Sequence, residues 1–237
     1  MEIIVNHLTR MAGGYVCIAG MENNSNRHIR PVLPGGTRLS TTALKRNGGP
    51  FDMAMLVDLG TVKPVPVNPE VEDHEFTLAS SKSMMVLTPI EFWKLLKSAA
   101  RGTFTDIFGP DLLIKGKESC GVTIGHGSSS LGCFLPPTLP ELYLGERDGK
   151  NKIRIKLSDG SFNVDLSVTD IRMYKNDHLT PNEKIVNLIR KKIMDGINVI
   201  LSVGLTRPFV KQGGDERVHW LQVNNIHTED DPIWQLR

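Results

Sequence analysis

The clearest pattern in the chain is an alternation of apolar and polar residues on both sides of an Asp-Gly pair. It runs through residues 150–157 and resumes at residues 162–168. A period of two is typical of half-buried strands, and Asp159-Gly160 suits the two-residue type I′ turn of a hairpin. Three apolar cross-strand pairs are then expected on the buried face: Leu157 with Phe162, Ile155 with Val164, and Ile153 with Leu166.

Short β-rich segments bounded by Gly, Pro and Asn recur about every ten residues elsewhere, a spacing typical of barrels and sandwiches. In the first half we expect strands near residues 2–6, 14–20, 27–33, 53–62 and 74–78. In the second half we expect them near residues 119–124, 141–145, 150–157, 161–168, 197–204 and 217–226. The chain is therefore predicted to be mainly β, with few helices.

Two helices are predicted, and both begin with the same short motif. Residues 88–91 read Thr-Pro-Ile-Glu and residues 180–183 read Thr-Pro-Asn-Glu, each a capping box with proline at the first helical position. The first helix is expected over 88–101, between the two halves. The second is expected over 180–195, with isoleucines every four residues forming an apolar face that covers a barrel.

Length and charge refine this picture. With 237 residues, 40% of them apolar, the chain can fill two cores of ordinary size, and we divide it into residues 1–118 and 119–237. The net charge of +2 is far from that of a strongly basic nucleic-acid-binding protein. The three cysteines lie in no zinc-binding spacing, and no secretory signal or membrane span is recognised, so a cytoplasmic location is expected.

Several segments, taken in order, resemble a bacterial and archaeal family of dual OB-fold domain proteins. They are residues 17–21, 27–32, 51–60, 164–170 and 201–205, which begin with Cys-Ile-Ala-Gly-Met and Arg-His-Ile-Arg-Pro-Val. His28 stands where an aromatic residue, usually Trp, is expected. The resemblance implies two OB-like Greek-key barrels in tandem, and OB surfaces commonly bind single-stranded nucleic acid or oligosaccharide. It implies no catalytic residues.

Two groups of basic residues are candidates for binding an anion. Lys150, Lys152, Arg154 and Lys156 alternate along one predicted strand and share a face, about 7 Å apart, which is comparable to phosphate spacing in an extended strand. We call these four residues the basic stripe; the alternative is a solvated strand face, partly neutralised by Asp165. The second group comprises Arg27, Arg30 and Arg38, in a stretch without acidic residues. These arginines could equally hold loops in place.

Three other polar segments are interpreted as loops. Residues 125–130 read Gly-His-Gly-Ser-Ser-Ser but match neither a phosphate-binding loop nor a nucleophile elbow. The acidic and histidine residues at 70–75 and 227–231 have no recognisable metal spacing, and we expect solvated loops there. No catalytic residue, metal site or cofactor is predicted.

These observations favour a non-catalytic binding or sensing module for an anionic ligand, either single-stranded nucleic acid or a nucleotide. No nucleophile, base and orienting group can be assembled from motifs. Two alternatives stay open. The first is an enzyme of nucleotide or nucleic-acid chemistry that uses Arg27, Arg30 and the loop at His126. The second is a protein-interaction scaffold, which would show a large exposed apolar patch.

Overall fold

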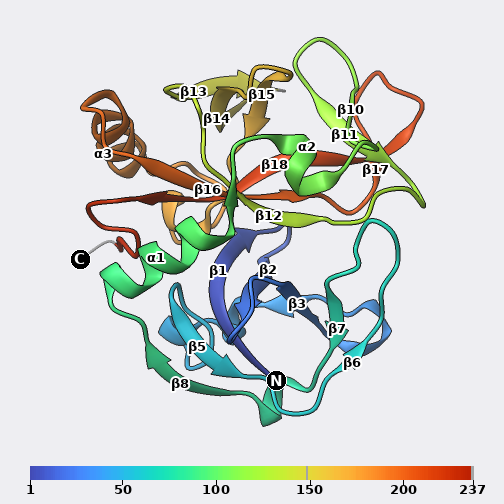
Figure 1. Cartoon of the computed structure of the whole chain (residues 1–237), viewed down its shortest axis with the longest axis vertical. Helices are drawn as coiled ribbons and strands as arrows, with labels where there is room; N and C mark the ends of the chain where they lie inside the picture. Colours follow the sequence, from blue (N-terminus) through green and yellow to red (C-terminus); the bar gives the residue numbers. More distant parts are fainter. Residues whose placement is uncertain (148, 236–237) are drawn as a thin grey trace.

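The computed structural model describes residues 1–147 and 149–235, and for Arg147 and Lys150 it describes the backbone alone. The fold is mostly β, with curled sheets arranged in two halves, one above the other in Figure 1, as expected for tandem OB folds. Within the described residues, no helix is long and apolar enough to cross a membrane.

The first half is an eight-stranded sheet with the order β6-β7-β3-β2-β1-β5-β8, in which β4 also pairs with β2. Its core is filled by large apolar side chains that include Ile3, Ile18 and Phe51. Its strands are β1 (Glu2–Arg10), β2 (Tyr15–Glu22), β3 (His28–Val32), β4 (Leu39–Ser40), β5 (Met55–Asp58), β6 (Lys63–Pro64), β7 (Asp73–Glu75) and β8 (Lys82–Val86).

The second half combines a seven-stranded sheet, in the order β10-β11-β18-β16-β12-β9 with β17 on β18, and a three-stranded sheet, β13-β14-β15. Both sheets contribute to one apolar core. Their strands are β9 (Ala100–Arg101), β10 (Leu113–Ile114), β11 (Cys120–Thr123), β12 (Leu131–Phe134), β13 (Glu141–Arg147), β14 (Lys150–Ser158), β15 (Asn163–Ser167), β16 (Val199–Leu205), β17 (Phe209–Val210) and β18 (Arg217–Thr228).

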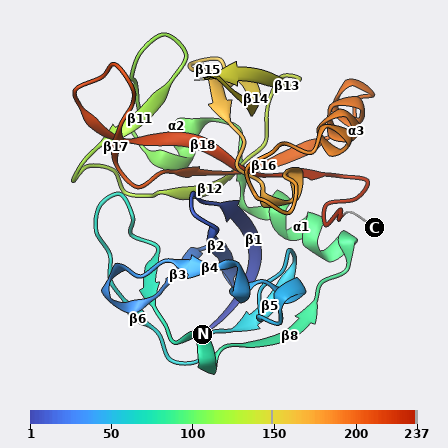
Figure 2. The same cartoon turned by 180° about the vertical axis from the view of Figure 1, so that it is seen from behind.

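Three α-helices flank these sheets: α1 (Pro89–Ala99), α2 (Phe104–Phe108) and α3 (Glu183–Met194). Helix α1 lies beside the junction of the two halves, and α3 covers one end of the second half (Figures 1 and 2). Short 3-10 helices lie at Pro34–Gly36, Thr41–Ala43, Lys45–Asn47, Leu78–Ser80 and Ile171–Met173.

The predicted start of α1 is confirmed, whereas that of α3 is wrong. The Thr88 side chain accepts from the Glu91 backbone N–H, and the Glu91 carboxylate accepts from the Thr88 N–H at 2.9 Å. In α3 the cap residue is Asn182 and makes no side-chain hydrogen bond. The Thr180 hydroxyl is instead 2.6 Å from an Asp177 carboxylate oxygen, so it is not available as a cap. The apolar face of α3 is buried as predicted.

The predicted register of the β14–β15 hairpin is wrong by two residues. Ile155 pairs with Leu166, and Leu157 pairs with Val164, because Asp159 to Phe162 form a four-residue loop in place of a two-residue turn. The Asp159 carboxylate accepts from the Phe162 N–H at 2.7 Å, which closes this loop with a side chain. A shift of two keeps each side chain on its face, so the apolar face is buried as predicted.

The chain passes from the sheet of the first half to the sheets of the second half near Ala100. There β9 pairs with β12, and α2 packs in the core of the second half. This position precedes the division after Glu118 that we drew from the sequence. The division into two OB-like barrels at residues 1–118 and 119–237 stays a prediction.

Candidate functional site: a cleft between the two halves

A cleft with a volume of about 970 Å³ lies where the two halves meet. Its first wall is built from the ends of β1 to β4, and its second wall from β16, β18 and the segment leading into β17. Among the described residues, its charged lining consists of four arginines and two carboxylates, namely Arg10, Arg30, Arg38, Arg207, Asp73 and Glu75. The lining is therefore net positive in a chain that is almost neutral overall.

Strand pairing brings Arg10 and Arg38 to the same part of the first wall. Arg10 is opposite Val16 in the β1–β2 pair, and Val16 is opposite Leu39 in the β2–β4 pair. Arg38 precedes Leu39 and lies with its guanidinium 5.7 Å from the centre of the Tyr15 ring. Arg10 and Arg38 are far apart in the sequence. The pairing of the strands, and not a run of basic residues, therefore creates this positive wall.

Arg30 lines the cleft and belongs to a chain of ion pairs that is buried except at Arg207. Its Nε is 2.5 Å from one Asp73 oxygen, and the other Asp73 oxygen is 2.6 Å from a nitrogen of Arg207. Arg207 also contacts Glu70 at 2.5 Å. Burial, the largest single effect, disfavours the Arg30 charge, but Asp73, Cys17 and Glu72 together raise the pKa of Arg30. The four side chains thus link the first half to the second across the cleft.

Two guanidinium nitrogens in this region are buried without a hydrogen-bond partner among the described residues: Nη2 of Arg30 and Nε of Arg10. The rest of the Arg10 side chain is held in place, since one nitrogen donates to the His178 carbonyl at 2.9 Å and the guanidinium stacks over Tyr174 at 4.2 Å. Buried donors without partners are costly, so each of these two nitrogens calls for an explanation such as an additional hydrogen-bond acceptor.

The second wall offers amides and apolar groups. Gln222 donates to the Asn224 amide oxygen at 2.8 Å, and Asn224 donates to Nδ1 of His7 at 3.0 Å. Gly204 permits this close approach, because a Cβ at that position would lie 2.5 Å from the Asn224 amide nitrogen. Leu205, Pro208 and Phe209 supply the apolar part of the wall.

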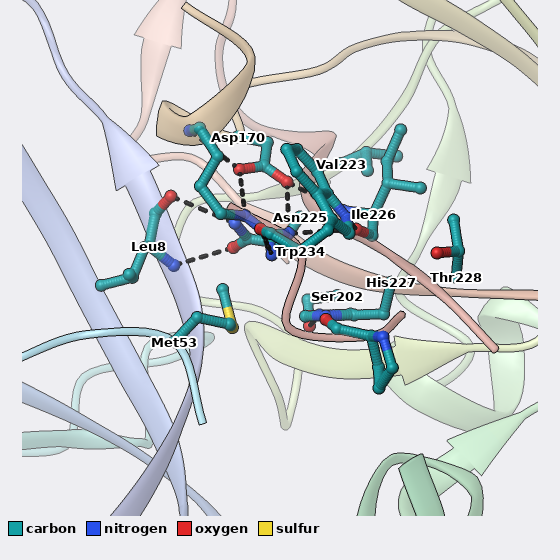
Figure 3. Close-up of polar contacts among 12 residues, drawn as sticks. Leu8, Met53, Asp170, Ser202, Val223, Asn225, Ile226, His227, Thr228 and Trp234 are labelled. Atoms are coloured by element: carbon teal, nitrogen blue, oxygen red, sulfur yellow. Dashed lines mark hydrogen bonds and ion pairs between the residues drawn. The ribbon is translucent and has the colours of Figure 1, made fainter. Parts of the chain in front are cut away.

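A buried polar network lies at the junction of the two halves (Figure 3). The Leu8 N–H donates to the Asn225 side chain at 2.7 Å, and the Ile226 N–H donates to Asp170 at 3.1 Å. Ser202 donates to the Asn6 carbonyl at 2.8 Å, and His227 lies 3.0 Å from the Ser202 hydroxyl. The Leu8–Asn225 and Ser202–Asn6 bonds cross between the halves, whereas the other two lie within the second half.

Three buried histidines near this junction are held neutral. Burial lowers the pKa of His28 to about 4. Burial, assisted by Arg172, lowers the pKa of His227 to about 3. Burial also lowers the pKa of His7, with further contributions from His28, His227 and Arg30. His28, where the dual OB-fold resemblance led us to expect an aromatic residue, is therefore part of the core.

The structure brings two of the three predicted arginines into the cleft. Arg30 and Arg38 line it, whereas Arg27 lies outside and forms an exposed ion pair with Glu22 at 3.1 Å. Sequence reasoning missed Arg10 and Arg207, which come from opposite ends of the chain. Nothing in their local sequence signals the site, because the cleft exists only once the halves are docked.

The basic stripe lies elsewhere, on the three-stranded sheet. Arg154 is buried, 3.3 Å from the Asp165 carboxylate and 2.7 Å from the Ser167 hydroxyl. The expected ion pair with Asp165 therefore forms, although Arg154 lies directly opposite Ser167 and not Asp165. Lys156 is exposed and pairs with Glu141 at 3.0 Å, while Lys152 is half-buried. The side chain of Lys150 lies outside the described part of the chain. A hollow of about 390 Å³ beside Arg154 shares no lining residue with the cleft.

The segments at 70–75 and 125–130, interpreted above as loops, are tied to each other. The Glu72 carboxylate accepts from the Ser130 N–H at 2.8 Å and from the Ser130 hydroxyl at 2.6 Å. Glu70, Glu72, Asp73 and His74 are buried, so the prediction of a solvated loop at 70–75 is wrong. The described residues contain no cluster of His, Cys, Asp and Glu that could hold a metal ion.

Comparison with known families agrees with this architecture. A model of the dual OB-containing domain matches residues 1–226, nearly the whole chain. The chain belongs to this family. The dual OB architecture accounts for the curled sheets, and OB folds commonly bind nucleic acids or other ligands. No curated protein matches the chain.

Proposed function

We propose that this dual OB-containing protein is a binding or sensing module for an anionic ligand, a nucleotide or single-stranded nucleic acid, held in the cleft between its halves. The observation that carries the proposal is the convergence of four arginines on one cleft, where two guanidinium nitrogens are buried without described partners. A cleft of about 970 Å³ is within the usual range for small-ligand sites, about 300–1,000 Å³.

The cleft is a better candidate than the basic stripe. In the stripe, Arg154 already bonds Asp165 and Ser167, and Lys156 pairs with Glu141. In the cleft, Arg38 is exposed and contacts a neutral ring, so its charge is available to a ligand. Lys150, Lys152, Arg154 and Lys156 stay a hypothesis for a second contact surface.

The cleft side chains favour binding over catalysis, which would need an activated nucleophile or base. Cys17 lines the cleft, but burial raises the pKa of its thiol and so disfavours the thiolate. Asp73 is engaged by two arginines and is not available as a base.

The experiment is an anisotropy titration with a fluorescein-labelled oligo(dT) and a fluorescent ATP analogue at low salt. We expect binding of at least one probe, and a loss of at least several-fold for Arg38→Ala. For a single strand, removing one phosphate-binding side chain should reduce the slope of log K against log salt by about 0.7. Arg27→Ala is the matched control, because Arg27 is exposed and lies outside the cleft. If neither probe binds, or if Arg38→Ala binds like wild type, the proposal is wrong.

The scaffold alternative has one observation in its favour. The edge strand β8 exposes Met84, Met85 and Val86 in succession, and Ile90 at the start of α1 is also exposed. Exposed apolar edge strands are prone to pair with another chain. Sedimentation at two protein concentrations, with Met85→Lys as the variant, tests this alternative, and a concentration-independent monomer would exclude self-association through β8.

A further inference from the structure

The two walls of the cleft differ in chemistry, and this difference specifies its ligand more narrowly. Three of the four arginines, Arg10, Arg30 and Arg38, belong to the first half. The second half contributes two side-chain amides and an apolar segment that ends at Phe209. A ligand that satisfies both walls has a strongly anionic part and a planar, partly apolar part with hydrogen-bonding edges.

We propose that the ligand is a single nucleotide, with its phosphates toward the arginines of the first half and its base against Phe209 of the second. This inference rests on the proposed function, because it assigns the ligand of the same cleft. It goes further by excluding a continuous strand and by assigning a base-contacting residue.

Phe209 has the properties of a stacking platform. The residue is 43% exposed although it is aromatic, and it lines the cleft. Its backbone is fixed, since the Trp220 indole N–H donates to the Phe209 carbonyl at 3.0 Å. The Trp220 ring lies 6.4 Å from the Phe209 ring and supports one side of it. An exposed aromatic ring held in this way suits a base, because every base has a π-face.

The amides of the same wall can recognise the edge of a base. The Asn224 side chain is occupied on both ends, by Gln222 and His7. Among described residues, no hydrogen bond uses the Gln222 amide oxygen, which leaves an acceptor for an exocyclic amine or a ring N–H. A bare polyphosphate would leave both this acceptor and the Phe209 ring without a partner.

A continuous strand fits the cleft less well than one nucleotide. OB-fold grooves for single strands usually accommodate about 4–16 nucleotides and need a continuous positive track. Here the cleft and the hollow beside the basic stripe have no lining residue in common. Arg154, in the middle of the stripe, is buried in contacts with Asp165 and Ser167. The cleft and the stripe thus do not form one continuous positive track among the described residues.

The test is calorimetric titration of the full chain with the four ribonucleoside triphosphates, inorganic tripolyphosphate and a ten-residue oligo(dT). We expect at least one triphosphate to bind more tightly than tripolyphosphate. Phe209→Ala should weaken that binding about 5- to 150-fold, the equivalent of one base stack, and leave tripolyphosphate binding unchanged. Val210→Ala is the matched control: Val210 is adjacent, 44% exposed and outside the cleft lining, so it should bind like wild type.

The outcomes separate this inference from the proposed function. Equal binding of tripolyphosphate and every nucleoside triphosphate, or an equal effect of Phe209→Ala on both, would overturn the base-binding role while leaving an anion site. If the oligonucleotide binds more tightly than every nucleoside triphosphate, and the slope of log K against log salt corresponds to several phosphate contacts, the ligand is a nucleic-acid strand. Absence of binding by every probe would refute the proposed function itself.

Discussion

Arg207 in the second half donates to Asp73 in the first half at 2.6 Å, and the same carboxylate holds the buried Arg30 at 2.5 Å. One carboxylate thus compensates a buried charge within its own half and connects the two halves. The two bonds differ in environment, because the Arg207 side chain is 49% exposed whereas that of Arg30 is 5% exposed. This asymmetry leads to the first prediction.

Asp73→Ala should destabilise the protein by about 3–5 kcal/mol, the usual cost of removing one partner of a buried ion pair. The cost arises because the Arg30 charge stays buried without compensation. Arg207→Ala should cost less than Asp73→Ala, because Asp73 keeps Arg30 as its partner and water can reach the half-exposed position of Arg207, although the buried Glu70 loses its close ion pair. Urea denaturation followed by circular dichroism measures both. Equal losses for the two variants would show that Asp73 acts mainly through Arg207.

The three buried histidines predict a loss of stability in mild acid. Their pKa values are depressed in the folded state, to about 4 for His28 and about 3 for His227, against about 6.5 when unfolded. Between the folded and unfolded pKa values, the unfolded chain binds more protons than the folded chain. The free energy of unfolding therefore falls as the pH falls from 6.5 toward 4. His28 alone should contribute a loss of about 3 kcal/mol over that window.

Replacing a histidine by a residue that does not titrate isolates this effect from the protonation of carboxylates. Denaturation of wild type and His28→Gln at pH 7, 6, 5 and 4 should give a shallower pH dependence for the variant, even if its stability at pH 7 is lower. The His7 ring, which lies 5.2 Å from the His28 ring, stays titratable in the variant. Parallel curves for the two proteins would mean that His28 does not stay neutral in the folded state.

The two Thr-Pro motifs, alike in sequence, predict different mutational costs. Thr88→Ala should cost about 1 kcal/mol, the typical value for removal of an N-cap, because the Thr88 side chain accepts from the Glu91 N–H. Thr180→Ala removes only an exposed hydrogen bond to Asp177 and should cost less than about 0.5 kcal/mol. Thermal melts of the two variants measure the difference. A larger loss for Thr180→Ala would mean that its motif does cap α3.

Much of the fold could be predicted because the information is local. Alternation located the β14–β15 hairpin and its buried face, and the capping box at Thr88 located α1. The errors occurred where a side chain replaced the expected backbone geometry. Asp159 closes a four-residue loop through its carboxylate, and Asp177 engages the hydroxyl of Thr180. Such competition between local hydrogen bonds is not visible in a residue pattern.

The candidate site could be predicted only in part because it is assembled from distant segments. Arg30 and Arg38 stand out in a stretch without acidic residues, but Arg10 and Arg207 are unremarkable in sequence and are brought together by the docking of the halves. The acidic residues at 70–75 have the composition of a solvated loop, yet they are buried. Their partners, Arg30, Arg207 and Ser130, lie far away along the chain.

Variants of the basic stripe can distinguish binding of a nucleic-acid strand from binding of a nucleotide in the cleft. We expect the triple variant Lys150→Ala, Lys152→Ala and Lys156→Ala to fold normally, since lysines on a sheet surface contribute little to stability. Binding of the fluorescent ATP analogue should be unchanged, because Lys152 and Lys156 are not among the described residues that line the cleft. If the stripe is a second contact surface, oligo(dT) binding should weaken, and its salt slope should fall by about 0.7 for each lysine that binds a phosphate in the wild type. A salt titration of both probes with wild type and the triple variant measures this. Loss of nucleotide binding in the triple variant would contradict the assignment of the ligand to the cleft. It would indicate that the ligand binds on the three-stranded sheet.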